Sequence, residues 1–131
     1  MATWTEWKNV GTNFEELTIA TVRGQASIYG GADVAGATRT AQTGIYNVVK
    51  SGKATLIFNG YVVSQVGSFN YTGINVYHNG ALIASNPKSR ITINVKKGDS
   101  IYAIGNYRVG DSTTTSHVGA GDVVLSIIEH D

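Results

Sequence analysis

The stretch Arg90-Ile91-Thr92-Ile93-Asn94-Val95 alternates polar and apolar side chains along its whole length. A period of two is typical of a β-strand that buries one face and leaves the other in water. Lys96-Lys97-Gly98-Asp99 follows, and its glycine and aspartate are residues that favour a tight turn. Residues 100–107 then form a second stretch rich in Ile and Tyr. The segment therefore predicts two consecutive strands joined by a turn.

The same criteria predict strands along most of the chain. Residues 74–78 and 81–84 flank Asn79-Gly80, the dipeptide that most strongly indicates a two-residue type I′ hairpin. The other predicted strands cover residues 17–22, 25–29, 45–49, 53–64 and 123–128. Many short strands with frequent turn signals predict an all-β fold, an antiparallel two-sheet sandwich of the jelly-roll type.

Two of these strands carry apolar side chains on both faces. Residues 123–128 are almost entirely aliphatic, which is typical of a central strand or one between two layers. Along residues 53–64, one face is apolar and the other is half apolar, so we expect a partner to cover part of the second face. Gly60 interrupts this strand and predicts a bulge or a bend.

Composition limits the classes of function. The chain has 131 residues, which fits one domain, and it has 16 glycines, one proline and no cysteine. A net charge of +1 without basic blocks argues against a nucleic acid as partner. No apolar run approaches the roughly 18–20 residues that a membrane span needs. The N-terminus does not have the pattern of a signal peptide.

The N-terminal residues 1–16 are predicted to form an anchor segment ahead of a β-sandwich domain of residues 17–131. Trp4, Trp7 and Phe14 are the expected contacts of this anchor with another subunit or a larger assembly, because large rings favour interfaces. A short helical turn is expected to begin at Asn13. Residues 30–44, 65–73 and 108–121 are expected to be exposed loops.

Three motifs occur in the order and rough spacing of a known family. They are Ser51-Gly52-Lys53-Ala54-Thr55-Leu56-Ile57-Phe58, Val76-Tyr77-His78-Asn79-Gly80, and the residues 91–101 that contain the Gly98-Asp99 turn. Over about residues 44–131 the chain resembles the tumour-necrosis-factor/C1q-like jelly roll. The resemblance implies a homotrimer packed around a threefold axis, of the kind found on bacteriophage fibres and capsids. The aliphatic residues 123–128 depart from the aromatic closing strand of that family, and its N-terminal strands have no clear counterpart here.

The half-apolar face of residues 53–64, the two-sided final strand and the strand tyrosines suggest where subunits meet. The predicted subunit interface consists of Ile57, Tyr61, Val63, Tyr102, Ile104, Val124 and Ile128.

A reactive centre is not indicated. His117 has Asp111, a Ser/Thr tract and Asp122 nearby, but a Ser/Thr/Gly loop is poorly suited to holding a catalytic triad. The same residues do not show the spacing of a dedicated calcium site. We therefore predict no catalytic residue, no metal and no cofactor, and we retain Tyr71, Asp111 and His117 as a candidate ligand loop.

These observations lead to a functional hypothesis. The sequence suggests a non-enzymatic virion structural protein of a bacteriophage, made in the host cytoplasm. It would be a homotrimeric capsid decoration protein or the receptor-binding head of a fibre, with itself and a capsid or tail as partners. The alternative is a carbohydrate-binding module or lectin that binds a glycan with its loops.

Overall fold

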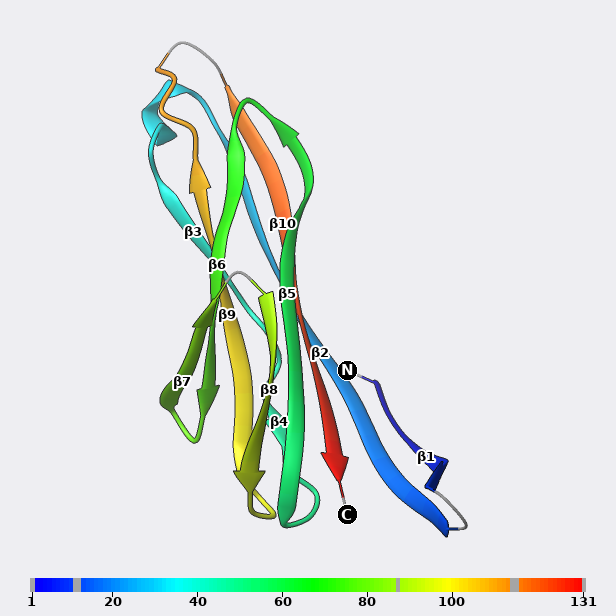
Figure 1. The fold of residues 1–131 in the computed structure, drawn as a ribbon. Helices are drawn as coiled ribbons and strands as arrows, with labels where there is room; N and C mark the ends of the chain where they lie inside the picture. The colour runs from blue at the N-terminus through cyan, green and yellow to red at the C-terminus, as the bar shows by residue number, and fades with distance from the viewer. Residues whose placement is uncertain (1, 11–12, 87, 114–115, 131) are drawn as a thin grey trace.

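The computed structural model describes the backbone of residues 2–10, 13–86, 88–113 and 116–130. Within these ranges it describes the side chains from residue 19 onward, except those of residues 32 and 88. Two sheets of antiparallel strands face each other, so the predicted all-β, two-sheet sandwich is confirmed (Figure 1). The elements are β1 (Ala2–Val10), β2 (Asn13–Gly30), η1 (Ala32–Val34), β3 (Thr38–Gln42), β4 (Tyr46–Asn47), β5 (Gly52–Val66), β6 (Phe69–His78), β7 (Ala81–Asn86), β8 (Lys88–Val95), β9 (Ser100–Val109) and β10 (His117–His130).

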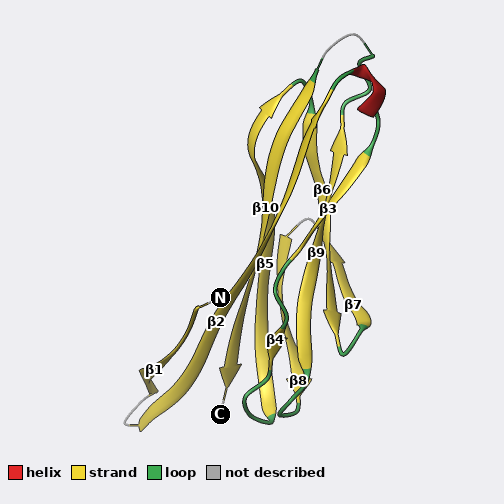
Figure 2. Ribbon diagram, turned by 180° about the vertical axis from the view of Figure 1, so that it is seen from behind, coloured by secondary structure: helices red, strands yellow, loops and turns green. Residues whose placement is uncertain are grey.

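The strand order is that of a jelly roll. The first sheet has the order β1-β2-β10-β5-β8, and the second has the order β3-β9-β6-β7, with β4 paired to β9. Apart from β1 and the short β4, eight strands form two four-stranded sheets, and the chain crosses repeatedly from one sheet to the other (Figure 2). The first and last of these eight strands, β2 and β10, are neighbours in the first sheet.

The turns agree with the sequence. β6 and β7 pair as a hairpin around Asn79 and Gly80, whose φ angles are 52° and 82°. Positive φ at both central residues is the requirement of a type I′ turn. Gly98, between β8 and β9, has a φ of 90°, which explains the glycine in that turn.

The central strand is β10, which lies between β2 and β5 as its two apolar faces predict. Its odd-numbered side chains are buried between the sheets, and Val123, Leu125 and Ile127 are fully inaccessible to water. Its even-numbered side chains lie on the outer face of the first sheet and are half-buried. One strand therefore supplies both the core and a surface.

Several predicted boundaries are wrong, for one common reason. The two strands expected at residues 17–22 and 25–29 form one strand, β2, which pairs with β10 without a break through Gly24. The expected loop at residues 30–44 contains η1 and β3. The expected loop at residues 65–73 is mostly the end of β5 and the start of β6, and residues 117–121 of the third expected loop begin β10. Sheet pairing overrides local composition in each case.

Three glycines in the first sheet make room for rings from the second. A methyl group at Gly119, Gly121 or Gly60 would overlap the ring of Phe69, Tyr107 or Tyr71, respectively. Phe69 and Tyr107 stack in parallel with ring centroids 5.2 Å apart. Gly60 therefore serves packing, and the predicted bulge lies a few residues further on, where the register of β5 with β10 shifts around Val63.

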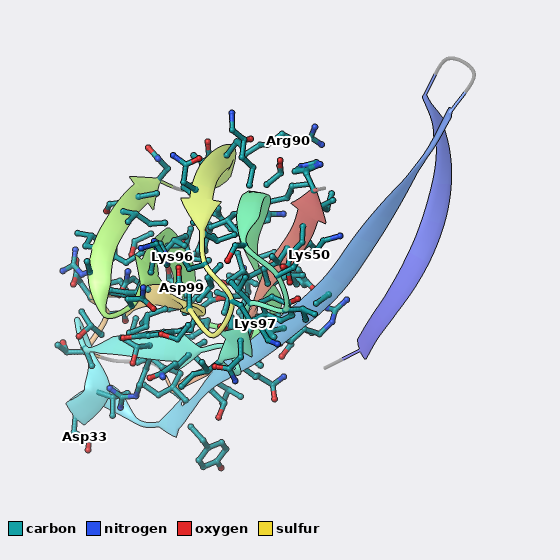
Figure 3. The ribbon with its side chains drawn as sticks, turned by 90° about the horizontal axis from the view of Figure 1, so that it is seen from below. Asp33, Lys50, Arg90, Lys96, Lys97 and Asp99 are labelled. Carbon is teal, nitrogen blue, oxygen red and sulfur yellow. The ribbon has the colours of Figure 1, made fainter. Side chains whose placement is uncertain are left out.

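The N-terminal segment forms a ribbon that leaves the sandwich. Residues 13–17 of β2 pair with residues 6–10 of β1 and with no other described strand, so the helical turn expected at Asn13 is wrong. This projecting ribbon (residues 6–10 and 13–17) reaches away from the body (Figure 3). Its backbone includes Trp7 and Phe14, while Trp4 lies nearby in β1.

The side chains of Trp4, Trp7 and Phe14 lie outside the described part of the chain. Their role as an anchor therefore stays a prediction. The division of the chain after residue 16 also stays a prediction, and β2 continues across that point.

The glycine–ring packing can be tested by Gly121→Ala. Because the added methyl group overlaps Tyr107, we expect the free energy of unfolding in urea to fall by roughly 1–3 kcal/mol, as for other overpacked cores. Gly44→Ala is the matched control, since the nearest atom to its new methyl group is 3.9 Å away, in Val22. Equal stability of the two variants would contradict the proposed packing.

Candidate functional site

An apolar cluster lies on the outer face of the first sheet, over the C-terminal half of β10. Ile128 of β10 is paired with Ile19 of β2, and Ser126, two residues before it, is paired with Ile57 of β5. Val124 extends the cluster along β10. Ile19, Ile57, Val124 and Ile128 are all half-buried although no described element covers them. The structure therefore brings together three of the predicted interface residues, Ile57, Val124 and Ile128.

Two further predicted interface residues lie on or beside the same face. Tyr61 is 41% exposed, and its hydroxyl donates a hydrogen bond to Oδ2 of Asp122 on β10 at 3.5 Å. Val63 is 53% exposed and lies where the register of β5 shifts. Both positions extend the apolar cluster toward the far end of the sheet.

The remaining two predicted interface residues lie elsewhere. Tyr102 and Ile104 belong to β9 and occupy the outer face of the second sheet, since the alternate residues Ile101 and Ala103 are buried. Tyr102 stacks on Tyr77 of β6 with centroids 5.1 Å apart. The predicted set is thus divided between opposite faces of the sandwich, and a single flat contact cannot include all of it.

Two shallow hollows adjoin the apolar cluster. One has a volume of about 330 Å³ and is lined by Arg23, Gly24, Gln25 and Asp122, on β2 and β10. The other has a volume of about 430 Å³ and is lined by Ile57, Phe58, Asn59, Ser89 and Arg90, on β5 and β8. The cluster therefore has a polar hollow on one side and a more apolar one on the other.

The three predicted loops do meet, at the end of the sandwich opposite the ribbon (Figure 1). Gly36 donates its backbone N–H to the carbonyl oxygen of Gly110 at 2.9 Å, and Gly110 donates to that of Ser68 at 2.6 Å. Tyr29, at the end of β2, is 89% exposed at this loop end. An aromatic ring so exposed is a candidate contact for a ligand or partner.

The candidate ligand-loop residues have separate roles there. His117 is 1% exposed, and its Nε2 donates a hydrogen bond to the carbonyl oxygen of Ser112 at 2.8 Å. Nδ1 of His117 has no partner among the described atoms. Asp111 is exposed and pairs with Arg108 at 2.9 Å. Tyr71 points toward Gly60, and burial raises the pKa of its hydroxyl to about 12.

A buried carboxylate joins the sheets at the ribbon end. Glu129 of β10 is inaccessible to water and accepts hydrogen bonds from the hydroxyl of Tyr46 and from the backbone N–H groups of Val49 and Lys50. Burial, and then the bond to Glu129, raise the pKa of Tyr46 well above its usual range. These bonds hold the segment after β4 against the end of β10, so the role of Glu129 is structural.

A second polar group lies at the β6–β7 and β8–β9 turns. Oδ2 of Asp99 accepts from Nε2 of His78 at 2.7 Å and from the backbone N–H of Lys96 at 2.9 Å. These residues line a hollow of about 300 Å³ together with Asn79, Asn94 and Val95. Asp99 thereby ties one turn to the other.

In the described part of the chain, no three His, Cys, Asp or Glu side chains gather as ligands for a metal ion. None of the helices in this part has the length and apolar character needed to cross a membrane.

Sequence reasoning missed Tyr29, Arg23 and Glu129. For Tyr29 a signal was present, because Ala26 and Ile28 are apolar and the alternate positions, Ser27 and Tyr29, should face outward. Glu129 gave no local signal, since its three donors come from residues about 80 positions away.

Asp99 leads to a prediction about pH. Hydrogen bonds from His78, then from Lys96 and Asn79, lower the pKa of Asp99 to about 2, compared with about 3.9 in an unfolded chain. The ionised form therefore stabilises the fold above about pH 4, and this contribution is lost as the pH falls toward 2. We expect Asp99→Asn to lower Tm at pH 6 and to have little effect at pH 2.

Circular dichroism at several pH values measures this difference, with Asp33→Asn in η1 as an exposed control. A Tm difference that stays constant down to pH 2 would show that the charge of Asp99 is not responsible.

Comparison with known proteins gave only distant structural likenesses. No family model and no curated protein sequence matches the chain. Among solved structures, a family 35 carbohydrate binding module from Clostridium thermocellum superposes with a TM-score of 0.36 at 12% identity, over 93% of this chain and 89% of the other. At this TM-score the likeness supports no argument about function. The resemblance to the tumour-necrosis-factor/C1q-like family is not confirmed by these comparisons.

Proposed function

We propose that the protein is a non-enzymatic structural subunit of a bacteriophage virion. It forms a homotrimer through the outer face of the first sheet and presents its loop end outward, as a capsid decoration protein or a fibre binding head. The N-terminal ribbon attaches each subunit to another subunit or to a larger assembly. The virion setting rests on the family resemblance of residues 44–131, and the self-assembly rests on the geometry.

The projecting ribbon is the observation that best supports self-assembly. A two-stranded ribbon is marginally stable in water on its own, because it has no third strand or packed face. Residues 13–17 pair with β1 and with no other described strand, and the second edge of β1 pairs with none of the described strands. A subunit that is complete as a monomer has no need of such an element.

The layout of the molecule fits this proposal. The ribbon and the loop end lie at opposite ends of the long axis (Figure 1), and the half-buried apolar cluster lies on β2, β5 and β10. A contact through the cluster would leave the loop end free. This is the arrangement expected of a subunit that attaches at one end and presents a surface at the other.

The outer face can be tested with Ile57→Arg. A charge placed in the contact costs several kcal/mol, so we expect the trimer to dissociate at least about 100-fold more readily, equivalent to about 3 kcal/mol. Light scattering with molar mass at micromolar concentrations measures the assembly. Ile104→Arg, on the outer face of the second sheet, is the matched control and should leave the trimer intact.

A wild-type protein that stays monomeric in this measurement would refute self-assembly. If Ile104→Arg disrupts the trimer and Ile57→Arg does not, the contact lies on the other face of the sandwich.

Glycan binding is a second candidate, and the exposure of Tyr29 favours it. Tyr29 presents an almost fully exposed ring beside the gathered loops, and an aromatic face can stack on the apolar face of a sugar. The polar Arg108–Asp111 pair is part of the same end. In this case the loop end would be the receptor-binding surface of the virion protein, or of a free lectin.

On a glycan array, we expect Tyr29→Ala to remove most of any binding that the wild-type protein shows, at least about tenfold, since a stacked ring contributes about 1.4 kcal/mol or more. Leu82→Ala is the control, because Leu82 is 56% exposed on β7, away from the loop end. Binding lost equally in both variants, or in neither, would contradict a site at Tyr29.

A further inference from the structure

The outer face of the first sheet carries more positive than negative charge. Arg23, Lys53 and Arg90 are exposed on this face, and Asp122 is its acidic residue among the described side chains. Neither Arg23 nor Arg90 forms an ion pair with a described residue. Arg90 projects from the surface of the body in Figure 3. These two guanidinium groups are therefore available to carboxylates of another molecule.

The projecting ribbon carries the opposite charge. Its sequence has three acidic residues and one basic residue, namely Glu6, Glu15, Glu16 and Lys8, for a net charge of −2. The ribbon and the outer face are therefore complementary in charge, and complementarity of this kind selects partners and orientations.

The dimensions also match. Five residue pairs of a ribbon extend roughly 17 Å at about 3.4 Å per residue. Arg23 on β2 and Arg90 on β8 are separated by three strand spacings in the first sheet, roughly 14 Å at about 4.8 Å each. A ribbon that crosses this face can therefore reach from one hollow to the other, over Ile57 and Val124.

We propose that the projecting ribbon of one copy lies across the outer face of the first sheet of a second copy, with the face of the ribbon to which its register assigns Glu6 and Glu15 directed toward Arg23 and Arg90. The ribbon points away from the body that it belongs to, so the contact is made between chains (Figure 3). Each copy gives a ribbon and receives one. Such a head-to-tail contact closes into a ring when the rotation between copies permits, and three copies make the smallest ring beyond a dimer.

This inference rests on the proposed self-assembly and specifies its contact. It accounts for three features together: an unsupported ribbon, a half-buried apolar cluster, and two arginines that form no ion pair with a described residue. A symmetric contact between the flat faces would place like charges opposite each other and leave the ribbons uncovered.

Charge reversal in the full-length chain provides the test. In one variant Arg23→Glu is combined with Arg90→Glu, and in the other Glu6→Arg is combined with Glu15→Arg, because Glu6 and Glu15 share one face of the ribbon. We expect each to weaken association by about tenfold or more, measured as Kd by analytical ultracentrifugation, because each places like charges across the contact. The variant with all four substitutions should return to within about threefold of the wild-type Kd.

The control is Lys97→Glu, an exposed residue in the β8–β9 turn, which should leave Kd unchanged. Circular dichroism checks that every variant is folded. A monomeric wild-type protein would overturn the self-assembly and this inference together. A wild-type oligomer that neither reversal weakens, or that the fourfold variant fails to restore, would overturn the ribbon contact and leave self-assembly standing.

Discussion

Three rings of the second sheet enter the interior opposite three glycines of the first sheet. Phe69 faces Gly119, Tyr107 faces Gly121, and Tyr71 faces Gly60. The two sheets lie close together in this half of the sandwich because these glycines leave room for the rings. Side chains on both sides would force the sheets apart or leave voids, and both cost stability. The hydroxyl of Tyr107 donates to the carbonyl oxygen of Asp122 at 2.6 Å, so the buried phenol is also satisfied. The loop end is built on this half of the core.

The other half is closed by a polar group. Glu129 lies on β10, the central strand of the first sheet. Tyr46, its hydrogen-bond partner, lies on β4, which pairs with β9 of the second sheet. A buried carboxylate that accepts from a hydroxyl and two backbone N–H groups is well satisfied, and each bond to a charged group is stronger than a neutral one. With both halves closed from within, Val124 and Ile128 of β10 lie half-buried on the outer face, where they can make an external contact.

Part of the candidate site was predictable because it depends on strand periodicity. Residues two apart share a face, so periodicity alone places Ile57 and Tyr61 on one face of β5, and Val124 and Ile128 on one face of β10. Tyr102 and Ile104 were grouped with them, although periodicity within β9 does not reveal which sheet β9 joins. The role of Tyr71 was also unpredictable, since its burial depends on a glycine in another strand.

The sequence by itself determined the all-β class, the Asn79-Gly80 hairpin, the turn at Gly98 and the central place of the last strand. These features follow from local torsional preferences and from a period of two, which neighbouring residues express. Tertiary structure alone decided that residues 117–121 continue a strand, that residues 13–17 project as a ribbon, and that Glu129 is buried. Each of these depends on a partner distant in the chain, such as the ring that covers a glycine or the backbone N–H groups that satisfy a carboxylate. The composition of the neighbouring sequence does not indicate which distant residues these partners are.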